Sequence, residues 1–150
     1  MRVISLLLIS ALVGCTPGAP PAGGGSAAAG TLTIDVSLTS SSVAASAYGS
    51  TGGFTPAVTT VALGSSVRFV NIDSFSHTST SLTGAAFPAA SPFGSSALNL
   101  SGNTLSGGWT SGTLGAGTAS QPLLADQTGT YLYGCFFHYS APMRGAIVVK

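Results

Sequence analysis

Hydrophobic and polar residues alternate along several short stretches of the chain, and this pattern predicts strands rather than helices. In TLTIDVSL (31–38) every second residue is apolar, which is the period of a half-buried strand. A strand pair is predicted at 57–63 and 66–72, on either side of a turn at Gly64-Ser65. Further strands are predicted at 77–82, at 129–135, at 145–150 and, as a weak edge strand because it contains Pro122, at 119–125.

The remaining sequence favours the same fold class. Residues 83–108 are rich in Ala, Ser, Gly and Pro, which predicts mostly loop with one short strand at 97–100. No stretch has the apolar spacing of an amphipathic helix of useful length. Many short strands with Gly- and Ser-rich turns predict an all-β fold, an antiparallel β-sandwich, and we expect Greek-key connections between its strands.

The first residues, MRVISLLLISALVGC, have the form of an export signal. A single charge at Arg2 precedes an apolar run over 3–13, which is too short to span a bilayer. Leu12-Val13-Gly14-Cys15 resembles the bacterial lipobox, and this resemblance implies cleavage of a 1–14 signal peptide and lipidation of Cys15. The alternative is an ordinary secretory signal with Cys15 there by chance.

A low-complexity segment follows. Residues 15–30 contain mostly Pro, Gly and Ala, which predicts a flexible tether of about 20 Å r.m.s. length. The folded domain is then expected at 31–150. The lipoprotein resemblance implies a protein anchored by lipid on the periplasmic or cell-surface face of a bacterial membrane.

Charge excludes one large class of partners. The 150 residues contain four basic and three acidic side chains, so only 5% are charged. Without a basic stripe, no nucleic-acid partner is expected. Partner recognition should instead be apolar and only weakly dependent on salt. The length favours one domain, and we expect a monomer.

The stretch CFFHYSAPM gathers residue types that are rare in this chain. It contains Cys135, His138 and Met143, and the whole chain has only two residues of each of these types. If Cys15 is lipidated, Cys135 has no partner for a disulfide, and a metal would both explain and protect its thiol. The other histidine, His77, lies just beyond the predicted strand at 66–72. In a Greek-key sandwich the ends of two such strands can meet at one pole.

One thiolate, two imidazoles and one thioether favour a particular metal. Zinc uses firm nitrogen, sulfur or oxygen ligands and not a thioether, and calcium and magnesium need oxygen ligands. Two histidines and a cysteine with a weak methionine are the ligands of a blue-copper site. The sequence therefore predicts one type 1 copper ion.

Two motifs resemble the cupredoxins, especially the plastocyanin-like small blue copper proteins. One runs from Gly64 through a strand and Asn-x-Asp to His77. The other is Gly-x-Tyr-x-Tyr-x-Cys-x2-His-x4-Met-x-Gly, ending at Gly145. The resemblance implies His77, Cys135 and His138 as equatorial ligands and Met143 as the axial one. It also implies a non-enzymatic electron carrier whose redox partner proteins dock near His138.

The sequence departs from the family pattern after the first histidine. Family members often have an asparagine there that braces the cysteine loop, and this chain has Thr78. Pro142 also removes a backbone N–H beside Met143. Phe75 and Phe137 are open to two interpretations, as core residues or as an apolar docking patch.

Three other functions compete with electron transfer. A copper chaperone or buffer could use the same four ligands, although such proteins usually present more exposed His and Met. A structural sandwich without metal would make the ligand spacing an accident. A cysteine hydrolase lacks an evident residue that would orient its base.

Overall fold

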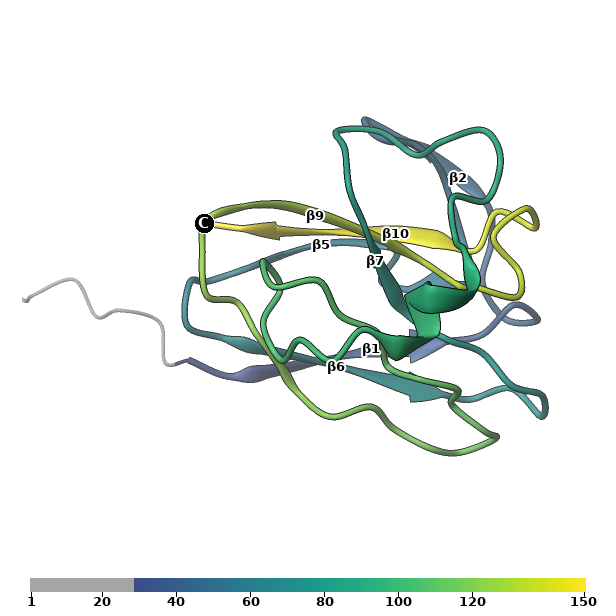
Figure 1. The fold of residues 1–150 in the computed structure, drawn as a ribbon, viewed down its shortest axis with the longest axis horizontal. Coiled ribbons are helices and arrows are strands. Elements are labelled where there is room, and N and C mark those ends of the chain that lie inside the picture. The colour runs from purple at the N-terminus through teal and green to yellow at the C-terminus, as the bar shows by residue number, and fades with distance from the viewer. Residues whose placement is uncertain (1–28) are drawn as a thin grey trace, which may run out of the picture.

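Two four-stranded sheets face each other across the interior in the computed structural model, which describes residues 29–150 (Figure 1). The sheet orders are β4-β1-β6-β8 and β5-β10-β9-β7, and β2 and β3 form a separate hairpin. The predicted signal peptide, the lipidation site Cys15 and nearly all of the predicted tether lie outside the described residues. The elements are β1 (Thr31–Val36), β2 (Ala44–Ser46), β3 (Gly49–Thr51), β4 (Phe54–Thr55), β5 (Val58–Val61), β6 (Ser66–Asn71), β7 (Thr80–Leu82), the 3-10 helix η1 (Ser95–Asn99), β8 (Leu123–Leu124), β9 (Gly129–Gly134) and β10 (Arg144–Val149).

The all-β sandwich is confirmed, but two features of its predicted pairing are wrong. β1 lies parallel to β6 and β5 lies parallel to β10, so the sheets are mixed rather than purely antiparallel. β5 and β6 do not pair, because they belong to different sheets. Gly64 has a φ of +84°, a conformation open to glycine, and the chain turns there from one sheet to the other. Val61 and Val67, on either side of this corner, both point into the core.

Aromatic side chains fill the space between the sheets. Phe69 of β6 stacks on Trp109 with ring centroids 5.4 Å apart, and Phe54 meets the edge of Tyr133 at 4.8 Å. Ile34, Phe69 and Tyr133 are fully buried, as the strand patterns predicted for their segments imply. Trp109, which lies outside the named strands, is fully buried as well. Packed aromatic pairs of this kind favour offset or edge-on contacts, and they join the two sheets into one core.

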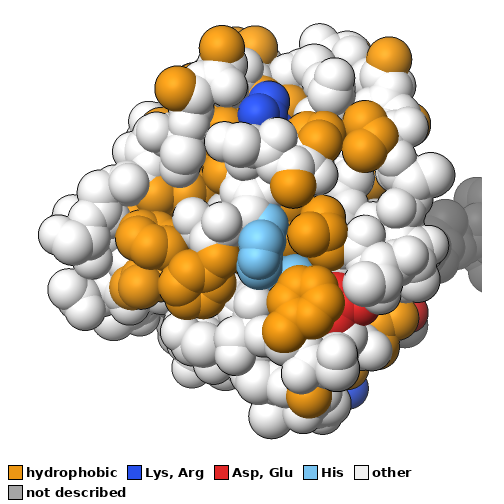
Figure 2. Space-filling model, turned by 90° about the vertical axis from the view of Figure 1, so that its right-hand side faces the viewer, with side chains coloured by type: hydrophobic (Ala, Val, Ile, Leu, Met, Phe, Trp, Pro, Cys, Tyr) orange, Lys and Arg blue, Asp and Glu red, His pale blue; other side chains and the backbone are white. Residues whose placement is uncertain are grey.

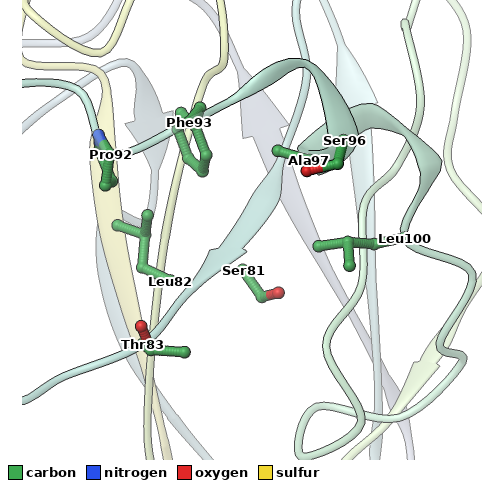
Figure 3. Close-up of a pocket in the computed structure, with 8 residues that line it drawn as sticks. All are labelled: Ser81, Leu82, Thr83, Pro92, Phe93, Ser96, Ala97 and Leu100. Atoms are coloured by element: carbon green, nitrogen blue, oxygen red, sulfur yellow. The ribbon is translucent and has the colours of Figure 1, made fainter.

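Two segments differ from the sequence-based predictions. Residues 39–56 contain β2, β3 and β4, which the pattern of small Ser, Ala and Gly residues did not reveal. The strand predicted at 97–100 is wrong, because the structure has the 3-10 helix η1 there. This helix faces β7 across a shallow pocket of about 280 Å³, lined among others by Leu82, Phe93 and Leu100 (Figure 3).

The strands give the domain two distinct poles. At one pole β1 and β6 begin together at Thr31 and Ser66, and the N–H of Ser66 donates to the carbonyl of Gly30. At the other pole β6 ends and the connection from β9 to β10 crosses over. The connection from β9 to β10, with Cys135 and His138, lies at the end of the sandwich away from the start of β1 (Figure 1). His77 meets these two residues there. No helix among the described residues is both long enough and apolar enough to cross a membrane.

Candidate metal centre

Three of the four predicted ligands converge at this second pole. The Nδ1 atoms of His77 and His138 are 3.1 Å apart. Cys135 Sγ lies 3.8 Å from the Nδ1 of His77 and 3.6 Å from the Nδ1 of His138. His77 and Cys135 are fully buried, whereas His138 is partly exposed. The structure thus brings together residues that lie far apart in the sequence, with their donor atoms facing one another.

The size of this triangle fits a transition-metal ion. A point equidistant from the three atoms lies about 2.0 Å from each, by the circumradius of a triangle with these sides, close to metal–nitrogen and metal–sulfur bond lengths of about 2.0–2.3 Å. The donors are one soft sulfur and two imidazoles, the trigonal set associated with blue copper. Within residues 29–150 no carboxylate belongs to this cluster, so the hard oxygen ligands of calcium or magnesium are not part of it.

The connection between β9 and β10 forms a closed loop that holds two of these donors. The N–H of Cys135 donates to the carbonyl of Met143 at 3.0 Å, and the N–H of Met143 donates to the carbonyl of His138 at 3.3 Å. The N–H of Ala141 also donates to the carbonyl of His138. Pro142 therefore removes no donor from this pattern, because Met143 itself supplies the N–H that closes the loop. The backbone of Met143 is tied directly to that of Cys135.

Met143 is fully buried at the base of the same loop, and its role as axial ligand stays a prediction. Gly53 packs against it from the segment before β4. A Cβ at Gly53 would lie 2.2 Å from the Cγ of Met143, far inside contact distance. Gly53 also has a φ of +73°, which favours glycine. A backbone bridge between Gly52 and Arg144 fixes this approach. Sequence reasoning missed Gly53, since its only signal was a Gly-Gly pair in an unassigned segment.

Backbone and side-chain contacts fix His77 on both sides. Its N–H donates to the carbonyl of Leu114 at 3.1 Å, and its carbonyl accepts from the N–H of Leu114 at 2.8 Å. The Nε2 of His77 lies 2.8 Å from a carboxylate oxygen of Asp73. Asn71 holds the loop before His77, because its side-chain amide donates to the carbonyls of Phe75 and Leu114. The imidazole is therefore held in place without a metal.

Asp73, the aspartate of the Asn-x-Asp motif before His77, accepts hydrogen bonds from several elements. Its carboxylate accepts hydrogen bonds from the hydroxyls of Ser37 and Thr39, the N–H of Leu38 and the ring of His77. Burial alone would raise the pKa of Asp73, but these hydrogen bonds outweigh it and hold the pKa well below its usual range. The carboxylate is therefore ionised at any physiological pH.

Thr78 braces the cysteine as the family's asparagine is expected to do. Its N–H points to Cys135 Sγ at 3.4 Å, and its hydroxyl oxygen accepts the N–H of Phe136 at 2.8 Å. The Thr78 hydroxyl also lies 3.9 Å from the sulfur. Since hydrogen bonds to a ligating sulfur tune its electronic properties, the departure at position 78 preserves the bracing of the loop while changing the group that makes it.

Hydrophobic side chains surround His138 where it reaches the surface. Phe75 lies 5.7 Å from the His138 ring and 4.8 Å from the His77 ring, and Phe137 lies 6.2 Å from the His138 ring. Phe75 and Phe137 are 39% and 47% exposed, so neither is an ordinary core residue. Figure 2 shows a histidine open in the middle of this face with hydrophobic side chains gathered around it. Burial, with a further contribution from His77, lowers the pKa of His138.

One family profile and several solved structures are similar to this chain. A profile described as copper binding proteins, plastocyanin/azurin family, matches residues 42–150. No curated protein matches the chain. Among solved structures, it is similar to a purple cupredoxin from Nitrosopumilus maritimus, with 18% identity, a TM-score of 0.49 and coverage of 79% of this chain and 99% of that one. It is also similar to a pseudoazurin from Sinorhizobium, with 24% identity, a TM-score of 0.46 and coverage of 81% and 74%.

The family profile covers both halves of the candidate centre. Its span includes His77 as well as the loop from Cys135 to Met143, so the match does not depend on the cysteine motif alone. The donor triangle supplies the independent chemical argument, since its three atoms have the spacing and softness that copper requires. The chain therefore belongs to the plastocyanin/azurin family of copper-binding proteins, with one type 1 copper ion as its cofactor.

Proposed function

We propose that this protein is a membrane-tethered blue copper protein that carries single electrons outside the cytoplasm. The observation that carries the proposal is the triangle of two Nδ1 atoms and one Sγ atom. His77, Cys135 and His138 would hold the copper, and the thioether of Met143 would be the weakest of the four ligands. When bound, the copper supplies one-electron cycling between Cu(II) and Cu(I).

Rigid donors support transfer of electrons rather than transfer of metal. Hydrogen bonds fix the His77 ring, the Cys135 sulfur and the backbone of Met143 before any metal binds. A site that is already arranged needs little rearrangement when the charge of its metal changes. The burial of His77 and Cys135 also counts against the alternative of a copper chaperone or buffer, since rapid exchange of copper needs ligands that a receiving protein can reach.

The exposed part of His138 is the proposed exit for the electron. Its ring reaches the surface among Phe75 and Phe137, and this small apolar area is where redox partner proteins would dock. Arg144, at the start of β10, is the charged side chain that borders the loop between β9 and β10. It is half-buried, and its guanidinium packs over the Tyr139 ring at 4.1 Å. Docking should therefore depend weakly on salt.

The point at which the chain enters the folded domain supports a membrane-anchored carrier. The chain enters the domain at Gly30 beside Ser66, at the pole opposite the donor triangle (Figure 1). A lipid on Cys15 would therefore leave the copper pole free to meet partners. This part of the proposal rests on the lipobox-like sequence before Cys15, and a Cys15→Ser variant should move the protein from the membrane fraction to the soluble fraction.

The central test is spectroscopic. The exported protein is purified, loaded with Cu(II) and compared with a Cys135→Ser variant by visible absorption and EPR. An intense blue band with narrow copper hyperfine splitting, absent from the variant, is the expected result because both arise from a thiolate bound to copper. A pale tetragonal spectrum that is unchanged by Cys135→Ser would refute the blue-copper function.

A second measurement separates electron transfer from copper handling. The oxidised and reduced proteins are each dialysed against a chelator of the same copper ion. An electron carrier retains its copper in both oxidation states. Rapid loss of Cu(I) on reduction, with the blue form intact beforehand, would favour the copper-handling alternative.

A further inference from the structure

A buried negative charge sits next to the donor triangle without a lysine or arginine beside it. Within residues 29–150 the only ion pair of Asp73 is with His77. The side chain of Asp73 is almost completely buried, and a buried charge without an opposite charge is costly. The neighbouring His77 is one of the proposed copper ligands. A copper ion held by this imidazole would therefore supply the positive charge that the carboxylate otherwise lacks.

The hydrogen bonds of the carboxylate determine which atom of His77 carries the proton. One carboxylate oxygen accepts from the hydroxyls of Ser37 and Thr39, and the other accepts from the N–H of Leu38 and faces the Nε2 of His77. An ionised carboxylate can only accept hydrogen bonds. The Nε2 of His77 must therefore be the donor, and in the neutral ring its Nδ1 is left with a lone pair directed at Cys135 and His138.

His138 provides a contrast within the same centre. Its Nδ1 takes part in the triangle, but among the described residues no hydrogen bond holds its Nε2. Only His77 therefore has an outer partner that fixes its tautomer and the orientation of its ring. Carboxylates that accept the second N–H of a metal-bound histidine are known to raise its basicity as a ligand.

We propose that Asp73 is a positioning residue of the copper centre, which fixes the ligating tautomer of His77 and stabilises Cu(II) relative to Cu(I). The inference rests on the proposed copper function. The negative charge attracts a doubly charged ion more strongly than a singly charged one, so Asp73 lowers the reduction potential. The carboxylate is held in place by the three residues that follow β1, Ser37, Leu38 and Thr39. The turn after β1 therefore has a part in setting the reduction potential.

The experiment has one measurement without copper and one with it. In the metal-free exported protein, ¹⁵N NMR of the imidazoles should show His77 with its proton on Nε2. In the copper-loaded protein, Asp73→Asn removes the charge at nearly constant shape. Its Cu(I)/Cu(II) ratio at a fixed solution potential should rise at least tenfold, equivalent to about 59 mV for a one-electron couple.

Asp126→Asn is the matched control. Asp126 also accepts hydrogen bonds from a serine, Ser106, but it follows Ala125, which bonds Gly64 and Ser65 at the opposite pole. A proton on Nδ1 of His77 in the metal-free protein would overturn the proposal. A shift for Asp73→Asn no larger than that of Asp126→Asn would overturn it as well. A protein that never becomes blue would instead refute the copper function, and the NMR result would still decide the tautomer.

Discussion

Gly53→Ala tests whether the space for Met143 depends on a glycine from a distant segment. The change adds a Cβ that would lie 2.2 Å from the Cγ and 2.9 Å from the Cβ of Met143. It also places a non-glycine residue at a φ of +73°, where L-residues lose about 1–2 kcal/mol. Relief of the overlap requires Met143 or the backbone to move, at a typical cost of about 1–3 kcal/mol for overpacking.

Gly64→Ala separates the two costs. Gly64 has a φ of +84°, and a Cβ there would meet no atom within 4 Å, so this variant has the backbone strain without the overlap. We expect Gly64→Ala to lose about 1–2 kcal/mol of unfolding free energy. Gly53→Ala should lose about 2–5 kcal/mol, which adds the overpacking to the strain.

The assay is urea unfolding of the metal-free proteins, followed by the copper spectra of both variants. Gly53→Ala should also alter the EPR spectrum of the copper-loaded protein, because it displaces the proposed axial ligand, whereas Gly64→Ala should leave the spectrum unchanged. Equal losses of stability in the two variants would refute the reasoning, since the overlap with Met143 would then cost nothing. An unchanged spectrum in Gly53→Ala would show that the position of Met143 does not reach the copper.

Two further predictions concern the hydroxyls of β9 and the pH dependence of stability. Tyr133→Phe should be neutral or stabilising by urea unfolding, because the buried hydroxyl of Tyr133 has no hydrogen-bond partner among the described residues. Tyr131→Phe should lose about 1 kcal/mol, because it removes the hydrogen bond to the carbonyl of Gln127. A larger loss of stability in Tyr133→Phe than in Tyr131→Phe would contradict this. The metal-free protein should become less stable as pH falls below the usual histidine pKa of 6.5. Burial lowers the pKa of His138, so the unfolded chain binds more protons than the folded one in this pH range. In His138→Gln the free energy of unfolding should depend less on pH over the same range.

The sequence predicted the long strands well, because each of them contains the large apolar residues that it buries. β1 and β6 alternate apolar residues with polar ones, whereas β9 and β10 contain nearly continuous runs of large apolar residues. Each of the four was expected within one or two residues of its bounds. Residues 39–56 gave no such signal, since Ser, Ala and Gly there contribute little apolar surface. The corner at Gly64 was misjudged for a different reason. A glycine marks a turn, but it does not specify whether the next strand stays in the same sheet.

The candidate metal centre also has residues that the sequence predicted and residues that it did not. His77, Cys135 and His138 were expected together because their residue types are rare in this chain and chemically specific, and the structure confirms that they converge. The supporting contacts of Asp73, Thr78 and Gly53 were not foreseen. Each of these depends on a partner in another strand or loop, and serine, threonine, aspartate and glycine are too common for their positions alone to indicate a metal site.

The two histidines of the centre have opposite surroundings, and this difference assigns them separate tasks. His77 is fully buried, bonded through its backbone to Leu114 and through its ring to Asp73, so it fixes the geometry and the electrostatic environment of the copper. His138 is partly exposed, and Phe75 and Phe137 lie beside it, so it is the ligand through which the proposed carrier would pass an electron to a partner. His77 cannot do both, because the burial that surrounds its ring with hydrogen-bond partners leaves it no edge at the surface. A substitution near His77 should therefore change the potential, whereas one near His138 should change the rate of exchange with a partner.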